Sequence, residues 1–348
     1  MKASGKKVIL AMSGGVDSAV SAWLLQKKGF EVRGIFLKLY NSDSFKEGFK
    51  KAKEISKILK MPISAVDAKK EFEKKVIDYF LKESKMGRTP NPCVVCNKEI
   101  KFGILLEKAL EMGADFLATG HYVKKTESEI GPKTIYKLSR ARDKKKDQSY
   151  FLWRLNQKKL KHVLFPLGGY TKKEVIEIAK TLGIMKLIKG ESRDICFIEN
   201  TTGEFLTSHL PEKPGKIVDV KGKTIGRHRG LWLYTIGQRK GIKLSGGPYY
   251  VLNKDLKSNT LTVTKNEKNL FGKELFCRDL NWISGKEPKS PLRAKAKIRY
   301  RHRISPAVSS FSEGRLKVIF EKPQRAITVG QSIVFYRNEE LLGGGLIC

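Results

Sequence analysis

Long apolar runs, acidic side chains and cysteines are all scarce in this 348-residue sequence. No stretch approaches the ~20 apolar residues that a membrane helix needs. The first residues run straight into a short apolar segment without the pattern of a signal peptide, so we expect a cytoplasmic protein with no membrane partner. The five cysteines, an odd number in so long a chain, argue against a disulfide framework and favour thiol, redox or metal chemistry.

The shortage of acidic residues leaves the chain strongly basic. The sequence has 35 Asp and Glu against 70 Lys and Arg, a formal net charge of +35. Such an excess exceeds what solubility needs and favours a polyanionic partner. The alternative is a set of solvated, lysine-rich helix faces, and residues 45–60 have that character. Composition alone does not choose between the two.

The first half of the chain alternates between short apolar runs and amphipathic segments. This alternation is typical of a parallel sheet covered by helices on both faces, with ligands at the carboxyl ends of the strands. The expected strands are residues 8–11, 32–37, 63–66 and 116–119, and the expected helices are residues 16–28, 44–59, 71–83 and 100–112. Residues 133–140 have the pattern of an exposed strand, and Thr171 with Glu174 predicts a capping box at a helix start.

From residue 201 onward the pattern changes to short period-2 segments separated by Gly, Pro and Asn, which favours all-β structure. The expected strands are residues 216–220, 249–252, 261–264, 316–320 and 332–336. We therefore expect an α/β domain over residues 1–200, a small β-rich domain over 201–270 and a barrel-like β domain over 271–348.

A glycine-rich turn, residues 13–18 (Ser-Gly-Gly-Val-Asp-Ser), lies between the first expected strand and the first expected helix. Such a turn aims backbone N–H groups and the positive end of the helix at one point, which makes an anion site. The glycines let the backbone approach a phosphate, and the Ser13 and Ser18 hydroxyls add donors. The turn has neither the Gly-Lys-Ser/Thr of a Walker loop nor the Gly-x-Gly-x-x-Gly of a dinucleotide fold. A plain tight turn with a capping serine is the structural alternative.

A basic residue occupies every second position of one segment near the C-terminus. The six are Arg293, Lys295, Lys297, Arg299, Arg301 and Arg303. In a strand these side chains would all line one face, because successive side chains point to opposite sides. Six aligned like charges repel one another unless a polyanion neutralises them, so the segment predicts a surface that holds a nucleic-acid backbone. Residues 237–241 form a second, weaker basic loop.

Three cysteines are candidates for chemistry. Cys93 and Cys96 lie in a proline-stiffened stretch before an expected helix, whose N-terminus favours the thiolate, as do the nearby Lys98 and Lys101. Cys196 can join them only through folding. Structural zinc is an alternative for the pair, but zinc sites usually have four ligands, and the sequence offers no second Cys-x-x-Cys or His pair.

Together these features resemble a known family, the tRNA-specific 2-thiouridylases of the PP-loop ATP pyrophosphatase group. The matching stretches cover nearly the whole chain, and several are long and distinctive. They are residues 13–18, 89–102 (TPNPCVVCNKEIKF), 118–122 (ATGHY), 146–152 (KDQSYFL), 194–198 (DICFI), 234–241 (YTIGQRKG), 329–336 and 343–345. The resemblance implies an N-terminal PP-loop domain, of the adenine nucleotide α hydrolase-like fold, followed by two small β domains that hold the tRNA.

The resemblance also implies a reaction. The enzyme would be a tRNA sulfurtransferase that uses ATP with Mg²⁺ to thiolate C2 of a uridine, the wobble uridine of the anticodon. The uridine O2 would attack the α-phosphorus and release pyrophosphate, and sulfur would then displace AMP from C2. The partners would be tRNA and a sulfur donor, either a cysteine desulfurase, a sulfur-relay protein or inorganic sulfide, and the chain would act as a monomer.

Site residues follow from the same resemblance. The implied ATP-binding positions are Ala11, Met12, Ser13, Gly14, Gly15, Val16, Asp17, Ser18, Leu37 and Gly120. The implied tRNA-contacting positions are Asn91, Pro92, Cys93, His121, Lys146, Asp147, Gln148, Arg299, Tyr300 and Gln331, the first three against the target base. Cys196 would carry a persulfide, and Cys96 would resolve it.

One position departs from the commonest family pattern, which has Asp where this chain has Cys93. That carboxylate is a candidate base, and here a third thiol replaces it. Three thiols without an obvious fourth ligand fit a [4Fe–4S] cluster held by Cys93, Cys96 and Cys196, whose open iron could bind hydrosulfide. The departure thus leaves two routes for sulfur, a cluster or a persulfide on Cys196 with Cys93 as a spare thiol.

Two other functions account for part of the sequence. A PP-loop enzyme that adenylates a small molecule for ligation or amidation would share the first strand, turn and helix, but it would need neither the basic segment nor the three cysteines. A non-enzymatic RNA-binding protein with structural zinc would explain the charge and the Cys-x-x-Cys pair, but not residues 13–18. Pyrophosphate release that depends on tRNA separates thiolation from both.

Overall fold

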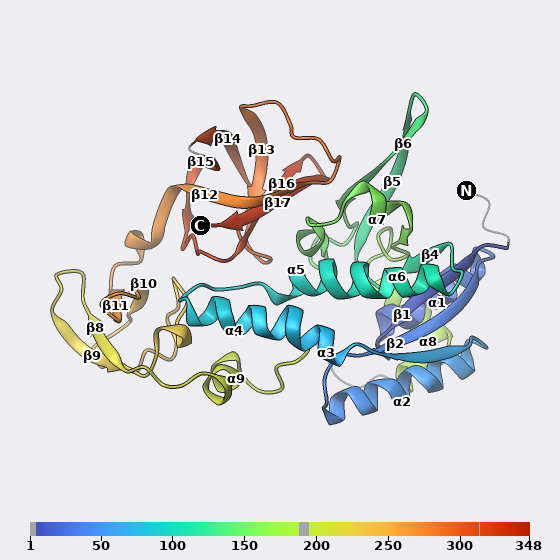
Figure 1. Ribbon diagram of the computed structural model, residues 1–348, viewed down its shortest axis with the longest axis horizontal. Helices are drawn as coiled ribbons and strands as arrows, with labels where there is room; N and C mark the ends of the chain where they lie inside the picture. The colour runs from blue at the N-terminus through green and yellow to red at the C-terminus, as the bar shows by residue number, and fades with distance from the viewer. Residues whose placement is uncertain (1–4, 188–194, 313) are drawn as a thin grey trace.

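The computed structural model describes residues 5–187, 195–312 and 314–348, and their strands form three sheets. Figure 1 shows the parallel sheet with its helices at one end of the molecule, and the barrel and the small β sheet at the other. The predicted fold class, an α/β domain followed by β domains of which the last is a barrel, is confirmed. No helix within these residues is both long and apolar enough to cross a membrane.

The apolar runs of the first half pair into a parallel sheet in the order β3-β2-β1-β4-β7. The strands are β1 (Lys7–Met12), β2 (Glu31–Lys38), β3 (Ile63–Asp67), β4 (Phe116–Ala118) and β7 (Val163–Leu164). Side chains of β1 alternate between two cores, since Val8 and Leu10 belong to one buried cluster and Ile9 to the other. Both faces of the central strand are therefore buried, which explains why it appears in the sequence as an unbroken apolar run.

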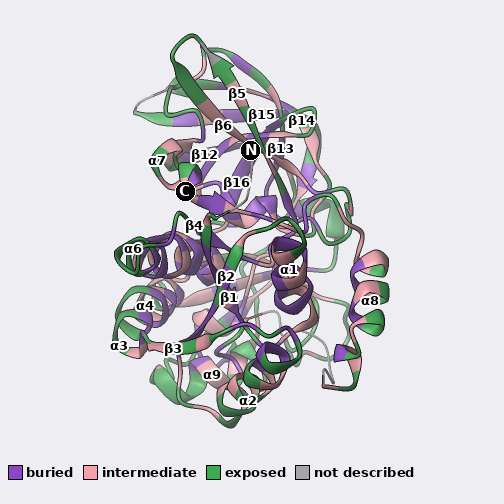
Figure 2. Ribbon diagram, turned by 90° about the vertical axis from the view of Figure 1, so that its right-hand side faces the viewer, coloured by how far each residue is buried: buried purple, intermediate pink, exposed green. Residues whose placement is uncertain are grey.

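Helices cover both faces of this sheet. Figure 2 shows α1 and α8 on one side of the strands and α4 and α6 on the other. The first group comprises α1 (Val16–Lys27), α2 (Asp43–Ile58) and α8 (Lys172–Thr181); the second comprises α3 (Lys69–Phe72), η1 (Glu73–Ile77), α4 (Asp78–Lys85), α5 (Pro92–Cys96), η2 (Asn97–Ile104) and α6 (Leu105–Glu111). The predicted capping box of α8 is present, because Thr171 Oγ1 accepts from the Glu174 N–H and the Glu174 carboxylate accepts from the Thr171 N–H.

Two of the predicted helices differ from expectation. The segments expected as single helices over residues 71–83 and 100–112 each contain a π-helical stretch, η1 and η2. The second also begins earlier, because Pro92 occupies the first helical turn, where its missing N–H costs nothing. Cys93 and Cys96 consequently lie inside the helical segment and not in a loop before it.

The second half begins with α9 (Thr202–His209) and then forms a small sheet in the order β10-β11-β8-β9. Its strands are β8 (Gly215–Val218), β9 (Thr224–His228), β10 (Tyr250–Asp255) and β11 (Thr260–Thr264). Ile217, Val251 and Leu261 are fully buried at its centre. The sheet thus has an apolar core of its own.

The C-terminal strands close into a barrel. They are β12 (Phe271–Trp282), β13 (Leu292–Lys297), β14 (Ser305–Ser312), β15 (Arg315–Arg325), β16 (Ser332–Arg337) and β17 (Glu340–Ile347). They pair in the order β12-β15-β14-β13-β16-β17, and β12 also pairs with β17, which closes the circle. The inward side chains, among them Val318, Phe320 and Phe335, are almost fully buried.

A hairpin of the first half continues the barrel sheet. It consists of β5 (Val123–Ile130) and β6 (Lys133–Arg140), and it projects beyond the parallel sheet in Figure 1. Strand β17 pairs with β6 through Glu340↔Ser139 and Leu341↔Leu138. The exposed strand expected at residues 133–140 is confirmed, and its partner in the barrel comes from two hundred residues further along the chain.

Short elements complete the fold. They are η3 (Ser149–Leu152), α7 (Gln157–Lys161), η4 (Ile184–Leu187), η5 (Leu231–Leu233) and η6 (Glu267–Leu270).

The basic segment near the C-terminus is only partly a strand. Strand β13 ends at Lys297, and residues 298–303 form a turn that leads to β14. Arg293 and Lys295 are exposed as expected, but Lys297 is buried, with its ammonium 5.5 Å from the centre of the Tyr300 ring. The prediction that all six basic side chains line one strand face is wrong, because the chain must turn after Lys297 to start the next barrel strand.

Candidate functional site

The centre of the parallel sheet offers a crevice for a ligand. Strand β1 has β2 on one side and β4 on the other, so the strand order reverses at β1 and the loops after β1 and β4 diverge there. These loops are residues 13–15 and 119–122. Gly120 lies against the first turn of α1, since a Cβ added to it would lie 3.1 Å from Asp17 C and Ser18 N. The glycine at position 120 is what allows this approach.

The turn after β1 is braced by its own serines. The Ser13 N–H donates to Ser18 Oγ (3.3 Å), the Gly15 N–H donates to Ser13 Oγ (3.3 Å), and Ser18 Oγ–H donates to Gly15 O (2.9 Å). These hydroxyls, which we expected to serve as ligand donors, thus hold the loop's shape. Gly15 is the N-cap residue of α1 and has an extended backbone. No side chain caps this helix, so the first N–H groups of α1 point into the crevice without a side-chain acceptor.

Gly14 packs tightly against the start of α2. Its φ is +77°, a conformation that favours glycine, and any Cβ there would clash with the backbone oxygen of Gly48. The loop is therefore held from two sides: α2 packs against Gly14, and Gly120 packs against Asp17.

Asp17, in the first turn of α1, joins three segments at the rim of the crevice. Lys172 Nζ donates to Asp17 Oδ1 (2.6 Å), and Tyr122 Oη donates to the same oxygen (2.7 Å). Burial and the Asp17 charge together raise the pKa of Tyr122, so its hydroxyl stays protonated and keeps donating. Neither Tyr122 nor Lys172 was among the predicted site residues, although Tyr122 lies within the 118–122 motif.

Three other positions expected to bind ATP lie at the ends of β1 and β2. Ala11 and Met12 end β1, and Leu37 is the penultimate residue of β2, with its side chain in the core.

The three cysteines are brought within electrostatic reach of one another. Cys96 is 7% exposed, Cys93 is partly buried and Cys196 is exposed. The pKa of Cys96 is raised to about 12, chiefly by burial and to a smaller extent by negative charge on Cys196 and Cys93. Although Cys196 as a residue is exposed, desolvation of its sulfur raises its pKa as well. The expectation that the helix start and the lysines favour a Cys96 thiolate is therefore wrong, because burial outweighs both.

The cysteines do not converge as metal ligands in this structure. Among residues 5–187, 195–312 and 314–348, no group of three or more His, Cys, Asp or Glu side chains is placed to hold a metal ion. The arrangement of Cys93, Cys96 and Cys196 described here therefore does not fit a [4Fe–4S] cluster.

Lys101 is the cation that the cysteines share. Its charge lowers the pKa of Cys96 and of Cys196, in both cases against the larger effect of burial. Lys101 lies in the middle of the π-helical stretch η2, five residues after Cys96, which directly precedes that stretch. Five residues make about one turn of a π-helix, so the two side chains lie on the same side, which an α-helical repeat would not give.

His121 is neutral and internal. Its Nδ1 is hydrogen-bonded to Thr119 Oγ1 (2.8 Å), and its ring packs 5.9 Å from that of Phe102. Burial, reinforced by the charge of Lys101, keeps the pKa of His121 well below 6.5. Since Gly120 touches the glycine loop and Lys101 acts on both His121 and the cysteines, the loop and the thiols belong to one region.

Several residues expected to contact tRNA are engaged within the protein. The Asp147 carboxylate accepts from Arg140 Nε, the Ala141 and Ser149 N–H groups and Ser149 Oγ. Gln148 Oε1 accepts from the Tyr122 N–H (3.0 Å), and Arg299 Nη2 donates to the carbonyls of Arg325 and Ala326. Lys146 is exposed.

Tyr300 and the residues before Cys93 are also packed. The Tyr300 ring lies 4.4 Å from that of Phe151. Pro92 is buried, and Asn91 hydrogen-bonds to the Tyr150 hydroxyl.

Thr89, just before the cysteine pair, touches both β domains. Its N–H donates to Val329 O (2.9 Å), and its carbonyl accepts from Gln331 Nε2 (2.8 Å). Its hydroxyl donates to Thr235 Oγ1 (3.4 Å). The barrel and the small sheet therefore both hold the segment that leads into α5.

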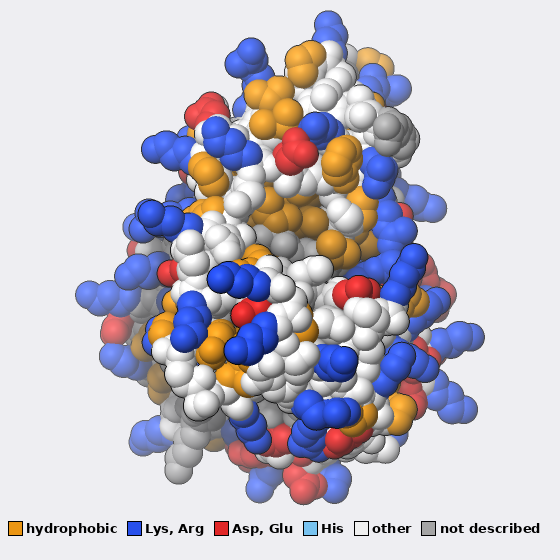
Figure 3. Space-filling view, turned by 90° about the vertical axis from the view of Figure 1, so that its left-hand side faces the viewer, with side chains coloured by type: hydrophobic (Ala, Val, Ile, Leu, Met, Phe, Trp, Pro, Cys, Tyr) orange, Lys and Arg blue, Asp and Glu red, His pale blue; other side chains and the backbone are white. Residues whose placement is uncertain are grey.

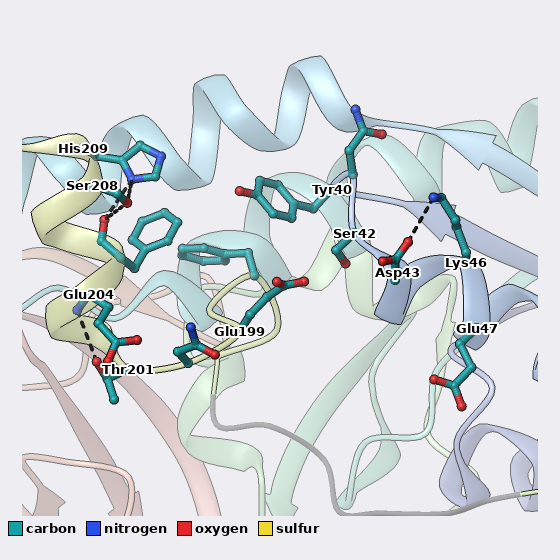
Figure 4. A pocket seen from close by; sticks show the side chains of 14 residues that line it. Tyr40, Ser42, Asp43, Lys46, Glu47, Glu199, Thr201, Glu204, Ser208 and His209 are labelled. Atoms are coloured by element: carbon teal, nitrogen blue, oxygen red, sulfur yellow. Dashed lines mark hydrogen bonds and ion pairs between the residues drawn. The ribbon is translucent and has the colours of Figure 1, made fainter.

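An open depression of about 1020 Å³ adjoins Cys196. Figure 4 shows labelled side chains of α9, such as Glu204 and His209, on one side and Asp43 and Lys46 from the start of α2 on the other. Phe197 and Glu199, just after Cys196, also line it.

Basic side chains cover much of the surface. Figure 3 shows many Lys and Arg side chains around the edges and over the lower half of one face, with Asp and Glu scattered among them. Arg301 and Arg303, in the turn after β13, are exposed.

Comparison with known proteins finds matches along the chain. Three family models match: "tRNA methyl transferase HUP domain" at residues 6–200, "tRNA methyl transferase PRC-barrel domain" at 203–265 and "Aminomethyltransferase beta-barrel domain" at 272–347. The chain is 42% identical over 357 residues to "tRNA-specific 2-thiouridylase MnmA" of Clostridium perfringens, covering 98% of each chain. It is 43% identical over 358 residues to the protein of the same name from Legionella pneumophila (strain Paris), again covering 98% of each.

A solved structure with a similar region is "U34-tRNA thiolase NcsA from Methanococcus maripaludis with its [4Fe-4S] cluster". It is 21% identical, with 53% of this chain and 58% of that chain covered, at a TM-score of 0.35.

Proposed function

The chain belongs to the family of tRNA-specific 2-thiouridylases, and from this membership we propose how its residues carry out the ATP-dependent 2-thiolation of a tRNA uridine. It is accordingly a tRNA sulfurtransferase with an ATP-using PP-loop domain. We assign this domain to residues 1–200, the small β domain to 201–270 and the barrel to 271–348.

The phosphates of ATP lie on the loop of residues 13–18, with Mg²⁺. One observation carries this assignment: the braced glycine loop, the Gly120 backbone and the cysteines meet in one region. The first N–H groups of α1 face the phosphates, and the end of β2 at Leu37 and the Gly120 backbone flank the adenosine.

Adenylation makes the uridine reactive. Its O2 attacks the α-phosphorus, and the bond to the bridging oxygen breaks as pyrophosphate leaves. An amide-like oxygen is a poor leaving group, whereas AMP is a good one, so C2 then accepts a sulfur nucleophile.

Sulfur arrives as a persulfide on Cys196, which is supported by that residue's exposure. The terminal sulfur attacks C2 and AMP departs with the C2–O electron pair, leaving a disulfide between C2-bound sulfur and Cys196. Cys96, after losing its proton, attacks Cys196 Sγ; this releases 2-thiouridine and forms a Cys96–Cys196 disulfide. A thiol reductant then restores both thiols.

A [4Fe–4S] cluster is the alternative sulfur carrier. Cys93, Cys96 and Cys196 would be its ligands, and it would supply sulfide-level sulfur. The three side chains do not converge as metal ligands here, so these residues support the persulfide route better.

The substrate is the wobble uridine of tRNA, held by the basic surface of the barrel. Arg293 and Lys295 on β13, Lys146, and the turn residues Arg301 and Arg303 offer exposed cations for phosphates. Asn91, Pro92 and Cys93 lie nearest the target base. The enzyme works as a monomer. A cysteine desulfurase or a sulfur-relay protein, which already carries sulfur as a persulfide, transfers it to the Cys196 thiol and is left with its own thiol. Inorganic sulfide would serve as donor only in the cluster alternative, because sulfide forms a persulfide only with a two-electron oxidant.

The test separates adenylation from sulfur transfer. Pyrophosphate release and 2-thiouridine are measured on unmodified tRNA with ATP and a sulfur source, after iron analysis of anaerobically purified enzyme. Cys196→Ser is expected to release pyrophosphate in a tRNA-dependent way while forming no 2-thiouridine, and Cys348→Ser is the matched control with both steps intact. Pyrophosphate release without tRNA would indicate a small-molecule ligase, and activity that tracks bound iron would favour the cluster.

A further inference from the structure

One part of the surface is acidic in a chain that is otherwise strongly basic. Residues 195–212, which include Cys196 and α9, contain three Glu and neither Lys nor Arg, although Lys and Arg make up 70 of the 348 residues. Helix α9 forms one wall of the open depression of about 1020 Å³ described above. Among the described residues that line this acidic depression, the one basic side chain is Lys46, and the acidic ones are Asp43, Glu47, Glu199 and Glu204. Phosphates of a nucleic acid would be repelled here.

Two of the four carboxylates have no cation beside them. Asp43 and Glu47 each pair with a lysine of their own helix, α2. Glu199 and Glu204 are exposed and make no ion pair with any residue that the structure describes. Figure 4 shows Glu199 between Glu204 of α9 and Asp43 at the start of α2. The charges of Glu199 and Glu204 therefore remain available to a partner.

The carboxylate of Glu204 is not used by its own helix. Helices α8 and α9 begin alike, with Thr at the N-cap and Glu three residues later. In α8 the Glu174 carboxylate accepts from the N-cap N–H and completes a capping box. In α9 the Thr201 hydroxyl oxygen accepts from the Glu204 N–H (3.2 Å), but the Glu204 carboxylate does not return the bond. It lines the depression instead.

Aromatic packing holds Cys196 and the acidic depression in a fixed relation. Phe197, the residue after Cys196, is buried, and its ring centre lies 5.7 Å from those of Phe72 and Phe80. The same ring lies 5.2 Å from that of Phe205 on α9. The thiol and the helix that carries Glu204 are therefore attached to one packed cluster of rings.

Sulfur transfer to Cys196 requires direct contact with the donor. The Cys196 thiolate attacks the terminal sulfur of the donor's persulfide, the donor's S–S bond breaks, and the donor leaves as a thiolate that takes up a proton. No net oxidation or reduction occurs. Because the two sulfur atoms must approach to a bond length of about 2 Å, a protein donor must lie on the residues around Cys196.

We propose that the acidic depression is the docking surface for the sulfur-donor protein, and that this protein carries its persulfide cysteine within a basic surface. Glu199 and Glu204 attract that surface and align it beside Cys196, while the same charges keep tRNA phosphates away. The inference rests on the persulfide route of the proposed function. It gives tRNA and the sulfur donor two separate surfaces of opposite charge.

The experiment uses two persulfide peptides of equal length, one with lysines on both sides of its cysteine persulfide and one with glutamates. Each is mixed with the full-length enzyme, and sulfur on Cys196 is followed by mass spectrometry. Although the enzyme has a net charge of +35, the lysine peptide is expected to react about tenfold faster than the glutamate peptide at low salt. This preference is expected to shrink as the salt concentration rises, because exposed charges are screened.

Two double variants complete the test. Glu199→Gln/Glu204→Gln is expected to abolish the preference for the lysine peptide, while tRNA binds as tightly as it does to the wild-type enzyme. The matched control is Glu111→Gln/Glu321→Gln, which removes two exposed carboxylates outside the depression. It is expected to keep the full preference.

Three results would contradict the proposal. Equal rates for the two peptides with wild-type enzyme, or an unchanged preference in Glu199→Gln/Glu204→Gln, would refute the docking surface and leave the persulfide route intact. Altered tRNA affinity in that variant would mean that the depression belongs to the tRNA surface. If neither peptide places sulfur on Cys196, the persulfide route of the proposed function is itself wrong.

Discussion

His121 is a buried, neutral imidazole that follows β4 and packs on Phe102 of η2, the stretch that comes after the cysteine pair. Sequence reasoning singled it out because it follows a strand at the carboxyl edge of the sheet, and that placement is confirmed. Its burial against Phe102 and Phe165 could not be foreseen, because these contacts join residues from separate elements.

The low pKa of His121 predicts a dependence of stability on pH. Below pH 6.5 the unfolded chain binds a proton at this residue while the folded protein does not, so the free energy of unfolding falls as the pH falls. The slope from this group approaches about 1.4 kcal/mol per pH unit. We expect His121→Gln to lose less stability than wild type between pH 6.5 and 5, measured by urea unfolding. Parallel curves for the two proteins would show that His121 is protonated in the folded state.

Exposure predicts the order in which the site thiols react. Cys196 is exposed, whereas Cys96 is buried with a pKa raised to about 12. Iodoacetamide attacks thiolates, so at pH 8 we expect the Cys196 peptide to be alkylated at least tenfold faster than the Cys96 peptide, by mass spectrometry. Cys277, also buried with its pKa raised to about 12, is the internal reference for a protected thiol. Equal rates for Cys96 and Cys196 would mean that α5 opens readily in solution.

Gly14 and Gly113 form a matched pair for measuring how tightly the phosphate loop is packed. Both have φ near +77°, but a Cβ at Gly113 would meet nothing within 4 Å, whereas one at Gly14 would clash with Gly48. We expect Gly113→Ala to cost about 1 kcal/mol and Gly14→Ala to cost more than about 2 kcal/mol, with loss of ATP binding. The measurements are chemical unfolding and calorimetric titration. Equal costs would show that α2 moves aside at no penalty.

At the scale of elements, sequence periodicity predicted where helices and strands lie but not their finer geometry. The strands of the parallel sheet appear as short runs rich in apolar residues, so the predicted segments 8–11 and 63–66 fall within β1 and β3. The π-helical stretch η2 went unnoticed because its apolar positions also satisfy an α-helical repeat. That stretch is what brings Lys101 to the side of Cys96, and no spacing rule for α-helices could have found it.

Strand β13 shows a second limit, since alternation of residue types does not reveal where a strand ends. The basic pattern continues to Arg303, but the strand stops at Lys297, which is 8% exposed. Only the long-range pairing with β14 and β16 determines that end.

This difference in exposure predicts how β13 contributes to tRNA binding. We expect Arg293→Gln and Lys295→Gln each to reduce the salt dependence of tRNA affinity by roughly one charge. Lys297→Gln, on the same strand but buried over aromatic rings, is expected to lower the melting temperature and leave the salt slope unchanged. Filter binding of tRNA at several salt concentrations tests this. If only Lys297→Gln reduced the salt dependence of the affinity, Lys297 and not Arg293 or Lys295 would be the residue that contacts phosphate.

At the scale of the whole molecule, the change of pattern near residue 201 was sufficient to predict α/β followed by β structure. The contacts between these parts were not predictable. Thr89 with Gln331, and β6 with β17, join residues about two hundred or more positions apart, and neither pair carries a local signal. Pairings of this kind depend on the completed fold.

The shared edge of β17 limits how the protein can be divided. Near Gly343–Ile347 this strand is covered by β12, but at Glu340 and Leu341 the same edge is covered by the β5–β6 hairpin of the catalytic domain. A barrel expressed alone would therefore expose unpaired backbone groups and the buried Leu341 side chain at one corner. Such a fragment is prone to edge-to-edge association, so the barrel cannot simply be moved to another protein.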